Sequence, residues 1–189
     1  MANRNFKPDS GNDLVLEDAG STDRLRITDG GSTILYEDGG SPALVINTDG
    51  SINKALQPCF LASAVDQAID DNSCTMVSFV AELFDQGGDF DTSTKTFTAP
   101  VAGKYLLSFS LSLNDAQSSY YYMKIITSHS DGDYVGAFRN DSGSANRAGR
   151  NLTIVAEMDA SDTAYCQICG SGGTESHDVI SWSKFSGCL

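Results

Sequence analysis

The stretch GGDFDTSTKTFTAPVAGKYLLSFSLSL, residues 87–113, decides the predicted fold of this chain. Between Tyr105 and Leu113, large apolar side chains occupy the odd positions, whereas Leu106 and three serines occupy the even ones. Such a period of two is typical of a strand with one buried and one polar face. Turn residues separate further short strand candidates, and no long stretch has the apolar spacing of a helix. The sequence therefore predicts an all-β sandwich or barrel over residues 55–189.

A different pattern precedes this region, because a unit of about ten residues recurs between positions 14 and 54 as LVLEDAGST, LRITDGGST, ILYEDGGSP and LVINTDGSI. Each unit is a short apolar strand followed by a turn, and Asp-Gly is interpreted as a tight-turn pair rather than a calcium loop. One chain alone would leave open edges and a thin core, so we expect three chains to form an intertwined β-stalk. Its core would consist of Leu14, Leu16, Leu25, Ile27, Ile34, Tyr36, Leu44 and Ile46.

Charge and hydropathy make nucleic acid and a membrane unexpected partners. Twelve Lys and Arg face 25 Asp and Glu, and the net charge of −13 would repel a nucleic-acid backbone. The sequence contains no run of 18 apolar residues that could span a membrane, and residues 1–13 contain no apolar core of a signal peptide. We therefore expect synthesis in a host cytoplasm, with residues 1–13 as a tail or as an anchor that docks on a larger assembly.

The chain contains five cysteines, Cys59, Cys74, Cys166, Cys169 and Cys188. An odd number without a secretory signal favours free thiols. Cys166 and Cys169 form a CxxC pattern, but it lies in the strand candidate TAYCQICG, where positions three apart point to opposite faces. A redox or zinc role for this pattern is therefore disfavoured.

Three segments in order resemble one known family: VSFVAELFDQGGDFDTSTKTFTAPVAGKYLLSFSL (77–111), NLTIVAEMDASDTAYCQI (151–168) and KFSGCL (184–189). Together they resemble the globular head of complement C1q, which shares its jelly roll with tumour necrosis factor. The chain departs from the family pattern at Lys95 and at positions 159–162, which are turn substitutions.

The resemblance implies a ten-stranded jelly-roll sandwich that forms a homotrimer. It also implies that Tyr165 and Gln167 line the trimer axis, and that weak calcium binding would involve Asp131, Asp133 or Asp141. No other cofactor is expected. The family's core positions fall on Phe79, Phe84, Phe90, Phe97, Tyr105, Phe109, Phe185 and Gly187.

No catalytic motif is found, so the chain is not expected to be an enzyme. His129 and His177 lie in Ser, Asp and Gly surroundings typical of loops. The most informative segment for binding is residues 120–150, because Tyr and Arg are enriched at binding hot spots. It supplies the candidate receptor contacts Tyr120, Tyr122, Arg139 and Arg147, although the three tyrosines at 120–122 are equally compatible with a strand packed on both faces.

These patterns together lead to two hypotheses on function. The first is a trimeric bacteriophage structural protein on the virion surface, either a short fibre or a capsid decoration or head spike. It would contact a capsid or tail protein through residues 1–13 and would attach to a host surface glycan or protein, or stabilise the capsid. The alternative is a bacterial cell-surface or spore-coat adhesion module with the same head.

Overall fold

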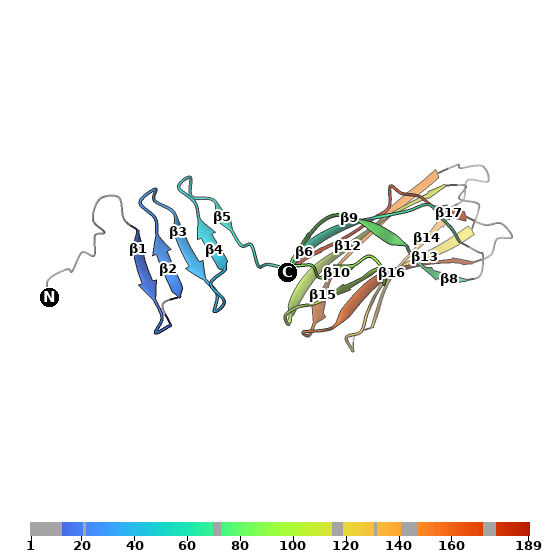
Figure 1. The fold of residues 1–189 in the computed structure, drawn as a ribbon. Coiled ribbons are helices and arrows are strands. Elements are labelled where there is room, and N and C mark those ends of the chain that lie inside the picture. The colour runs from blue at the N-terminus through green and yellow to red at the C-terminus, as the bar shows by residue number, and fades with distance from the viewer. Residues whose placement is uncertain are drawn as a thin grey trace. The chain divides into compact units, whose positions relative to one another are not determined.

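The computed structural model describes residues 13–20, 22–69, 73–114, 119–130, 132–140, 147–171 and 177–189, and Figure 1 shows its elements. Within these ranges the secondary structure consists of strands and turns without a helix, which confirms the all-β prediction. The chain divides into two compact units, Met1–Gln57 and Pro58–Leu189, close to the predicted start of the head at residue 55. The proposed anchor, residues 1–13, lies almost entirely outside the described residues.

The first unit is an antiparallel sheet whose strands follow one another in sequence order. Tight turns join the strands, and Gly31, Gly40 and Gly50 adopt φ angles of 89°, 81° and 82°, which only glycine adopts without strain. The repeated turn signal thus produces a meander of short strands. These strands are β1 (Leu14–Glu17), β2 (Asp23–Ile27), β3 (Thr33–Tyr36), β4 (Pro42–Ile46) and β5 (Ile52–Asn53).

Strand register determines which apolar side chains share a face of this sheet, because directly paired residues in antiparallel strands lie on the same side. Leu25 pairs with both Leu16 and Leu35, and Leu35 in turn pairs with Leu44. A second row on the same face runs from Leu14 through Ile27, Thr33 and Ile46 to Ile52. We call the resulting surface the apolar face; its residues are Leu14, Leu16, Leu25, Ile27, Leu35, Leu44, Ile46 and Ile52.

Register also corrects part of the predicted stalk core, because Ile34 and Tyr36 lie on the opposite face. Ile34 pairs with Arg26, whose guanidinium stands 6.0 Å from the Tyr36 ring centroid. Strand β3 reads TILY, with apolar residues on both faces, so its own pattern could not decide its orientation. The pairing of Ile27 with Thr33 decides it, and Leu35 joins the apolar face instead.

Ion pairs connect charged side chains on the opposite face of the sheet and in its turns. Arg24 pairs with Asp18 and, at 2.6 Å, with Asp38, while Arg26 pairs with Asp23 at 2.5 Å. All of these pairs are partly exposed, so they orient the turns more than they stabilise the sheet. The apolar face has no comparable cover within the described residues of this unit, and Leu16, Leu35 and Ile52 are 56%, 44% and 63% exposed.

The second unit, the head, is built from two sheets of seven and six strands. The seven-stranded sheet contains β6 (Cys59–Ala64), β7 (Gln67–Ile69), β9 (Phe79–Gln86), β12 (Gly103–Asn114), β15 (Arg147–Met158), β17 (His177–Val179) and β18 (Lys184–Cys188). The six-stranded sheet contains β8 (Cys74–Met76), β10 (Phe90–Asp91), β11 (Thr96–Thr98), β13 (Ser119–Thr127), β14 (Asp133–Asn140) and β16 (Thr163–Ser171). The strand count exceeds the ten that the resemblance implied, because pieces of two or three residues such as β7, β8, β10 and β17 extend the edges.

Aromatic side chains fill the space between the two sheets. The ring of Phe60 stacks on Phe97 with centroids 4.7 Å apart and meets Phe185 edge-on at 5.0 Å. At Gly187 an added Cβ would stand 2.6 Å from Leu107 Cδ2 and 2.7 Å from Phe60 Cε1, so only glycine fits there. Of the predicted core, the structure buries Phe79, Phe90, Phe97, Tyr105, Phe109 and Phe185.

Phe84 was predicted to be a core residue, and this prediction is wrong. Its side chain is 49% exposed and pairs with Leu61, which points away from the core. The register between β6 and β9 shifts twice, after Leu61 and after Ser63, so β9 does not keep a simple alternation from Phe79 onward.

The expectation of free thiols is also wrong for four of the five cysteines. Disulfides join Cys59 to Cys188 and Cys74 to Cys169, both between paired strands. Cys166 is free and buried, and its burial raises the pKa of the thiol well above the ordinary value. Cys166 and Cys169 thus have different surroundings, and the CxxC pattern does not act as a pair.

Candidate binding surface

Strand β13 presents two kinds of side chain to its two sides. Tyr121 and Met123 are buried between the sheets, whereas Tyr120 and Tyr122 are 50% and 38% exposed. Within the chain this strand therefore packs on one face only, through the middle ring, and receptor contact by Tyr120 and Tyr122 stays a prediction. The outer face of the six-stranded sheet is our candidate binding surface.

A hollow of about 490 Å³ lies on this outer face, between parts of β8, β13, β14 and β16. Its wall includes the Cys74–Cys169 disulfide, Tyr122, Lys124 and Val135. The disulfide links β8 to β16, and Tyr122 pairs with Cys169 directly across the strands, so the wall is fixed by the sheet itself. A pocket with an aromatic ring, an ammonium group and an apolar side can hold a small polar ligand without covalent chemistry.

The cations around the hollow are tied to specific neighbours. Lys124 Nζ lies 3.6 Å from a carboxylate oxygen of Asp133. The guanidinium of Arg139 lies over the ring of Tyr120, 5.2 Å from its centroid. These contacts pre-orient positive charge beside exposed aromatic rings, an arrangement suited to recognising a partner with polar or anionic groups.

Arg147 is the one predicted receptor residue that the structure places elsewhere. It lies on β15 in the seven-stranded sheet, with its guanidinium 4.5 Å from the ring centroid of Trp182. Trp182 is 60% exposed and was not among the predicted receptor contacts. The chain's single tryptophan, in the turn before a terminal strand, was the signal that could have identified it.

The two residues predicted to line the trimer axis lie on this same outer face. Gln167 pairs with Lys124, and Tyr165 pairs with Ile126. Both are half-buried. The outer face of one sheet thus holds residues that were predicted for two different tasks, trimer contact and receptor contact.

The outer face of the seven-stranded sheet also carries exposed apolar side chains. Val155 pairs with Leu106, and their side chains are 61% and 52% exposed. Leu106 also pairs with Cys188 of the Cys59–Cys188 disulfide. Leu61 and the exposed Phe84 continue the same surface towards β9. We call this surface the apolar stripe; its residues are Val155, Leu106, Cys188, Cys59, Leu61 and Phe84.

Of the three predicted calcium ligands, the structure describes Asp133 alone. Asp131 and Asp141 lie outside the described residues. Asp133 is described, and its carboxylate faces Lys124. Calcium binding by these three residues stays a prediction.

Comparison with protein-family models matches residues 59–189 to the C1q domain. The chain belongs to the C1q domain family. Its fold is similar to the globular domain of zebrafish complement 1qA protein, with a TM-score of 0.56 and 19% identity over 70% of this chain and 96% of that one. It is also similar to murine APRIL, with a TM-score of 0.52 and 10% identity over 70% of this chain and 98% of that one.

These similarities confirm the jelly-roll fold of the head. The match to C1q begins at Cys59, so the N-terminal sheet has no counterpart in it. At identities of 19% and 10%, the two solved structures show a shared fold alone. The comparison with curated proteins finds no match. Across the described residues, no helix has the length and apolar character needed to cross a membrane.

Proposed function

We propose that this C1q-domain protein is a trimeric, non-enzymatic recognition module on the surface of a bacteriophage particle, acting as a short fibre or a capsid decoration. The observation that carries the proposal is that each unit leaves one apolar surface uncovered: the apolar face of the N-terminal sheet and the apolar stripe of the head. Exposed apolar surfaces of this kind mark sites of association. Two such surfaces on one short chain favour self-association through both units.

In this proposal the apolar stripe, rather than the sheet that carries Tyr165 and Gln167, forms the trimer contact of the head. Small side chains accompany the stripe, since Ser108 and Thr153 share a hydrogen bond of 2.9 Å between their hydroxyls. Small residues allow close approach of a second copy, and the large apolar residues beside them lose water on contact. The opposite sheet then keeps its outer face, with Tyr122 and Lys124, free for a host glycan or protein.

Two matched substitutions test this assignment. Leu106 and Val135 are 52% and 51% exposed, and they lie on the outer faces of the two different sheets. Leu106→Asp should convert the trimer into monomers at micromolar concentration, because a carboxylate would lose its water in the contact. Val135→Asp should leave the trimer intact. Sedimentation velocity measures both, and the reverse result would favour the sheet that carries Tyr165 and Gln167.

The setting on a virion requires a separate experiment, because the alternative is a bacterial cell-surface or spore-coat adhesion module. Two disulfides favour a working environment outside a reducing cytoplasm, and a released particle and a cell surface both provide one. Antibodies against the protein should label purified phage particles by electron microscopy. Labelling of host envelopes or spores, with unlabelled particles, would favour the alternative.

A further inference from the structure

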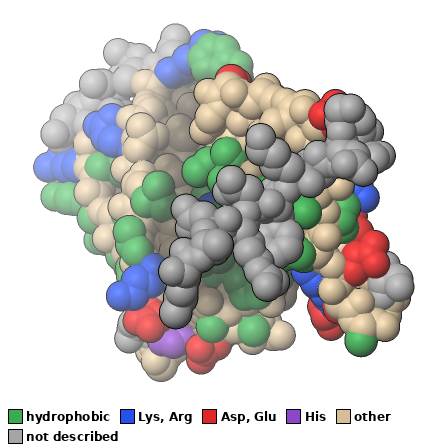
Figure 2. All heavy atoms as spheres, turned by 90° about the vertical axis from the view of Figure 1, so that its left-hand side faces the viewer, with side chains coloured by type: hydrophobic (Ala, Val, Ile, Leu, Met, Phe, Trp, Pro, Cys, Tyr) green, Lys and Arg blue, Asp and Glu red, His purple; other side chains and the backbone are tan. Residues whose placement is uncertain are grey.

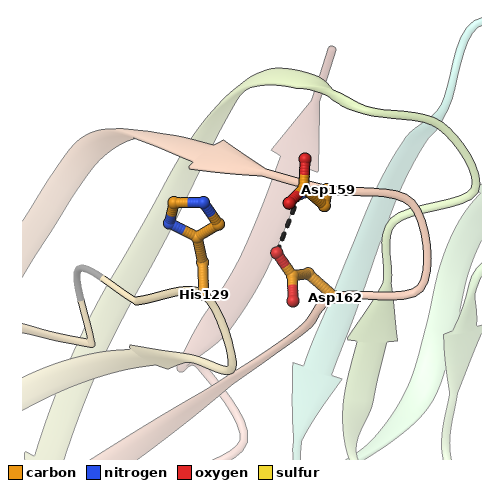
Figure 3. A group of neighbouring side chains, drawn as sticks. All are labelled: His129, Asp159 and Asp162. Atoms are coloured by element: carbon orange, nitrogen blue, oxygen red, sulfur yellow. Dashed lines mark hydrogen bonds between the residues drawn. The ribbon is translucent and has the colours of Figure 1, made fainter.

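One histidine and two aspartates from neighbouring turns of the head lie close together (Figure 3). His129 lies in the turn between β13 and β14, and Asp159 and Asp162 lie in the turn between β15 and β16. One ligand atom from each side chain lies within 4.8 Å of the other two. Figure 2 shows a histidine side chain at the surface with acidic side chains beside it.

Backbone hydrogen bonds hold the two turns in place. The Ser128 amide donates to the Thr163 carbonyl at 2.9 Å, which ties the first turn to β16. In the second turn, the Asp162 amide donates to the Asp159 carbonyl at 3.0 Å, and the Ser161 amide donates to the Ala99 carbonyl at 2.7 Å. Main-chain hydrogen bonds therefore fix the relative position of the two turns that carry the three side chains.

The carboxylate of Asp162 is oriented by a further pair of hydrogen bonds. Its Oδ1 accepts from the Ser128 hydroxyl at 2.7 Å, and its Oδ2 accepts from the Asp159 amide at 2.8 Å. These two hydrogen bonds fix the direction in which the carboxylate of Asp162 points. Each oxygen retains a second lone pair, so the carboxylate can still bind a cation.

We propose that His129, Asp159 and Asp162 form a zinc-binding site. An imidazole nitrogen with two carboxylate oxygens is a ligand set that zinc accepts, and water would complete the tetrahedron beside the exposed Asp159. Calcium and magnesium prefer oxygen ligands throughout, so the imidazole disfavours them. Ser128 orients Asp162 through its hydroxyl hydrogen bond, and metal-binding carboxylates are commonly oriented in this way.

The distances allow this coordination with small movements. Tetrahedral zinc with bonds of about 2.0–2.2 Å places neighbouring ligand atoms roughly 3.4 Å apart. The ligand atoms here lie within 4.8 Å of one another, so they must approach by at most about 1.4 Å. Asp159 is the exposed member of the three, so its side chain can rotate toward the other two. A bound ion would join the β13–β14 turn to the β15–β16 turn.

Isothermal titration calorimetry tests the proposal: the full-length protein is treated with EDTA, dialysed and titrated with zinc chloride. We expect one zinc ion per chain. His129→Ala and Asp159→Asn should each raise the dissociation constant at least about tenfold. Glu157→Gln is the matched control, because it removes the same charge from an exposed position two residues away and should bind zinc as the wild type does.

The variants are chosen so that loss of folding cannot imitate loss of binding. Asp162 is left unchanged because its carboxylate holds the turn, whereas Asp159→Asn preserves every hydrogen bond described there. The melting temperature of each variant in EDTA should equal that of the wild type. Two results would overturn the proposal: no zinc binding by the wild type up to about 1 mM, or equal affinity in wild type, His129→Ala and Asp159→Asn. Calcium chloride binding as tightly as zinc would also contradict the ligand assignment.

Discussion

The N-terminal sheet and the head are both antiparallel β-structures, but only the head has a second layer. In the head, two sheets bury Phe60, Phe79, Phe97, Phe109 and Phe185 between them, each at 1% exposure or less. The N-terminal sheet has an apolar face of similar chemistry, and the described residues of this unit form no second sheet that could cover it. Among the described residues of this unit, none of its apolar side chains is fully buried.

The strand pattern thus predicts where apolar surfaces form but not what covers them. A sandwich supplies its own cover within one chain, and a single sheet of short strands must obtain it from another molecule. If the proposed trimer dissociates, the head should therefore stay folded, whereas the N-terminal sheet should lose stability.

Truncation inside the head should have the largest effect. Phe185→Ala should lower the free energy of unfolding of the head by about 3–5 kcal/mol, because it removes a ring that contacts Phe60, Phe79 and Phe90 and leaves a cavity. Urea denaturation followed by circular dichroism measures the loss. Tyr120→Ala, at a half-exposed ring, should change stability by only about 0.5 kcal/mol. Equal losses in the two variants would contradict the proposed core.

Loss of the long-range disulfide should have the next largest effect. Cys59 and Cys188 join the first and last long strands of the head across 129 residues. Replacing both with serine should destabilise the head by about 2–5 kcal/mol, because the unfolded chain gains conformational freedom. The same urea titration detects this change, and a loss below about 1 kcal/mol would show that the disulfide does not constrain the unfolded state.

A truncation on the apolar face should affect assembly. Leu35→Ala should weaken the trimer by about 1.5–3 kcal/mol for each side chain that loses its contact. Ile34→Ala is the matched control, because Ile34 neighbours Leu35 and faces the opposite side of the same strand. Sedimentation equilibrium over a dilution series compares the two variants. Stronger dissociation by Ile34→Ala would mean that the wrong face of the sheet has been assigned.

Acid should affect the N-terminal turns with the smallest energies. Asp18 and Glu37 accept backbone hydrogen bonds in their turns, which lowers their pKa values below the ordinary 3.8 and 4.5. Their stabilising contribution is complete above those ordinary values and is lost as the pH falls through the lower, folded values. In the head, burial raises the pKa of Asp89, so its protonation has the opposite sign. Amide exchange measured by NMR between pH 6 and pH 3 should show the N-terminal turns opening first, and earlier opening at Asp89 would contradict this order.

The sequence predicted the head well because its central strand alternates without interruption. Tyr105 to Leu113 keeps a period of two over its whole length, and all its odd positions are buried. Phe84 could not be placed in the same way, because two register shifts between β6 and β9 intervene and no residue pattern marks them. Register is a property of two strands, and one strand's pattern does not contain it.

The candidate site was only partly predictable for a related reason. Tyr120, Tyr122 and Arg139 came together because they lie on two strands joined by one turn. Arg147, also nearby in sequence, went to the other sheet beside Trp182. The disulfide partners are 95 and 129 residues apart, so only the folded sheets reveal them.

The most direct test of the account is the native mass of the wild-type protein in solution. Light scattering of the full chain at micromolar concentration and physiological salt should give a single species of three times 20.1 kDa. The apolar face and the apolar stripe would then both be covered by other copies. A stable monomer of 20.1 kDa would contradict the proposal that copies of the chain associate through these two surfaces.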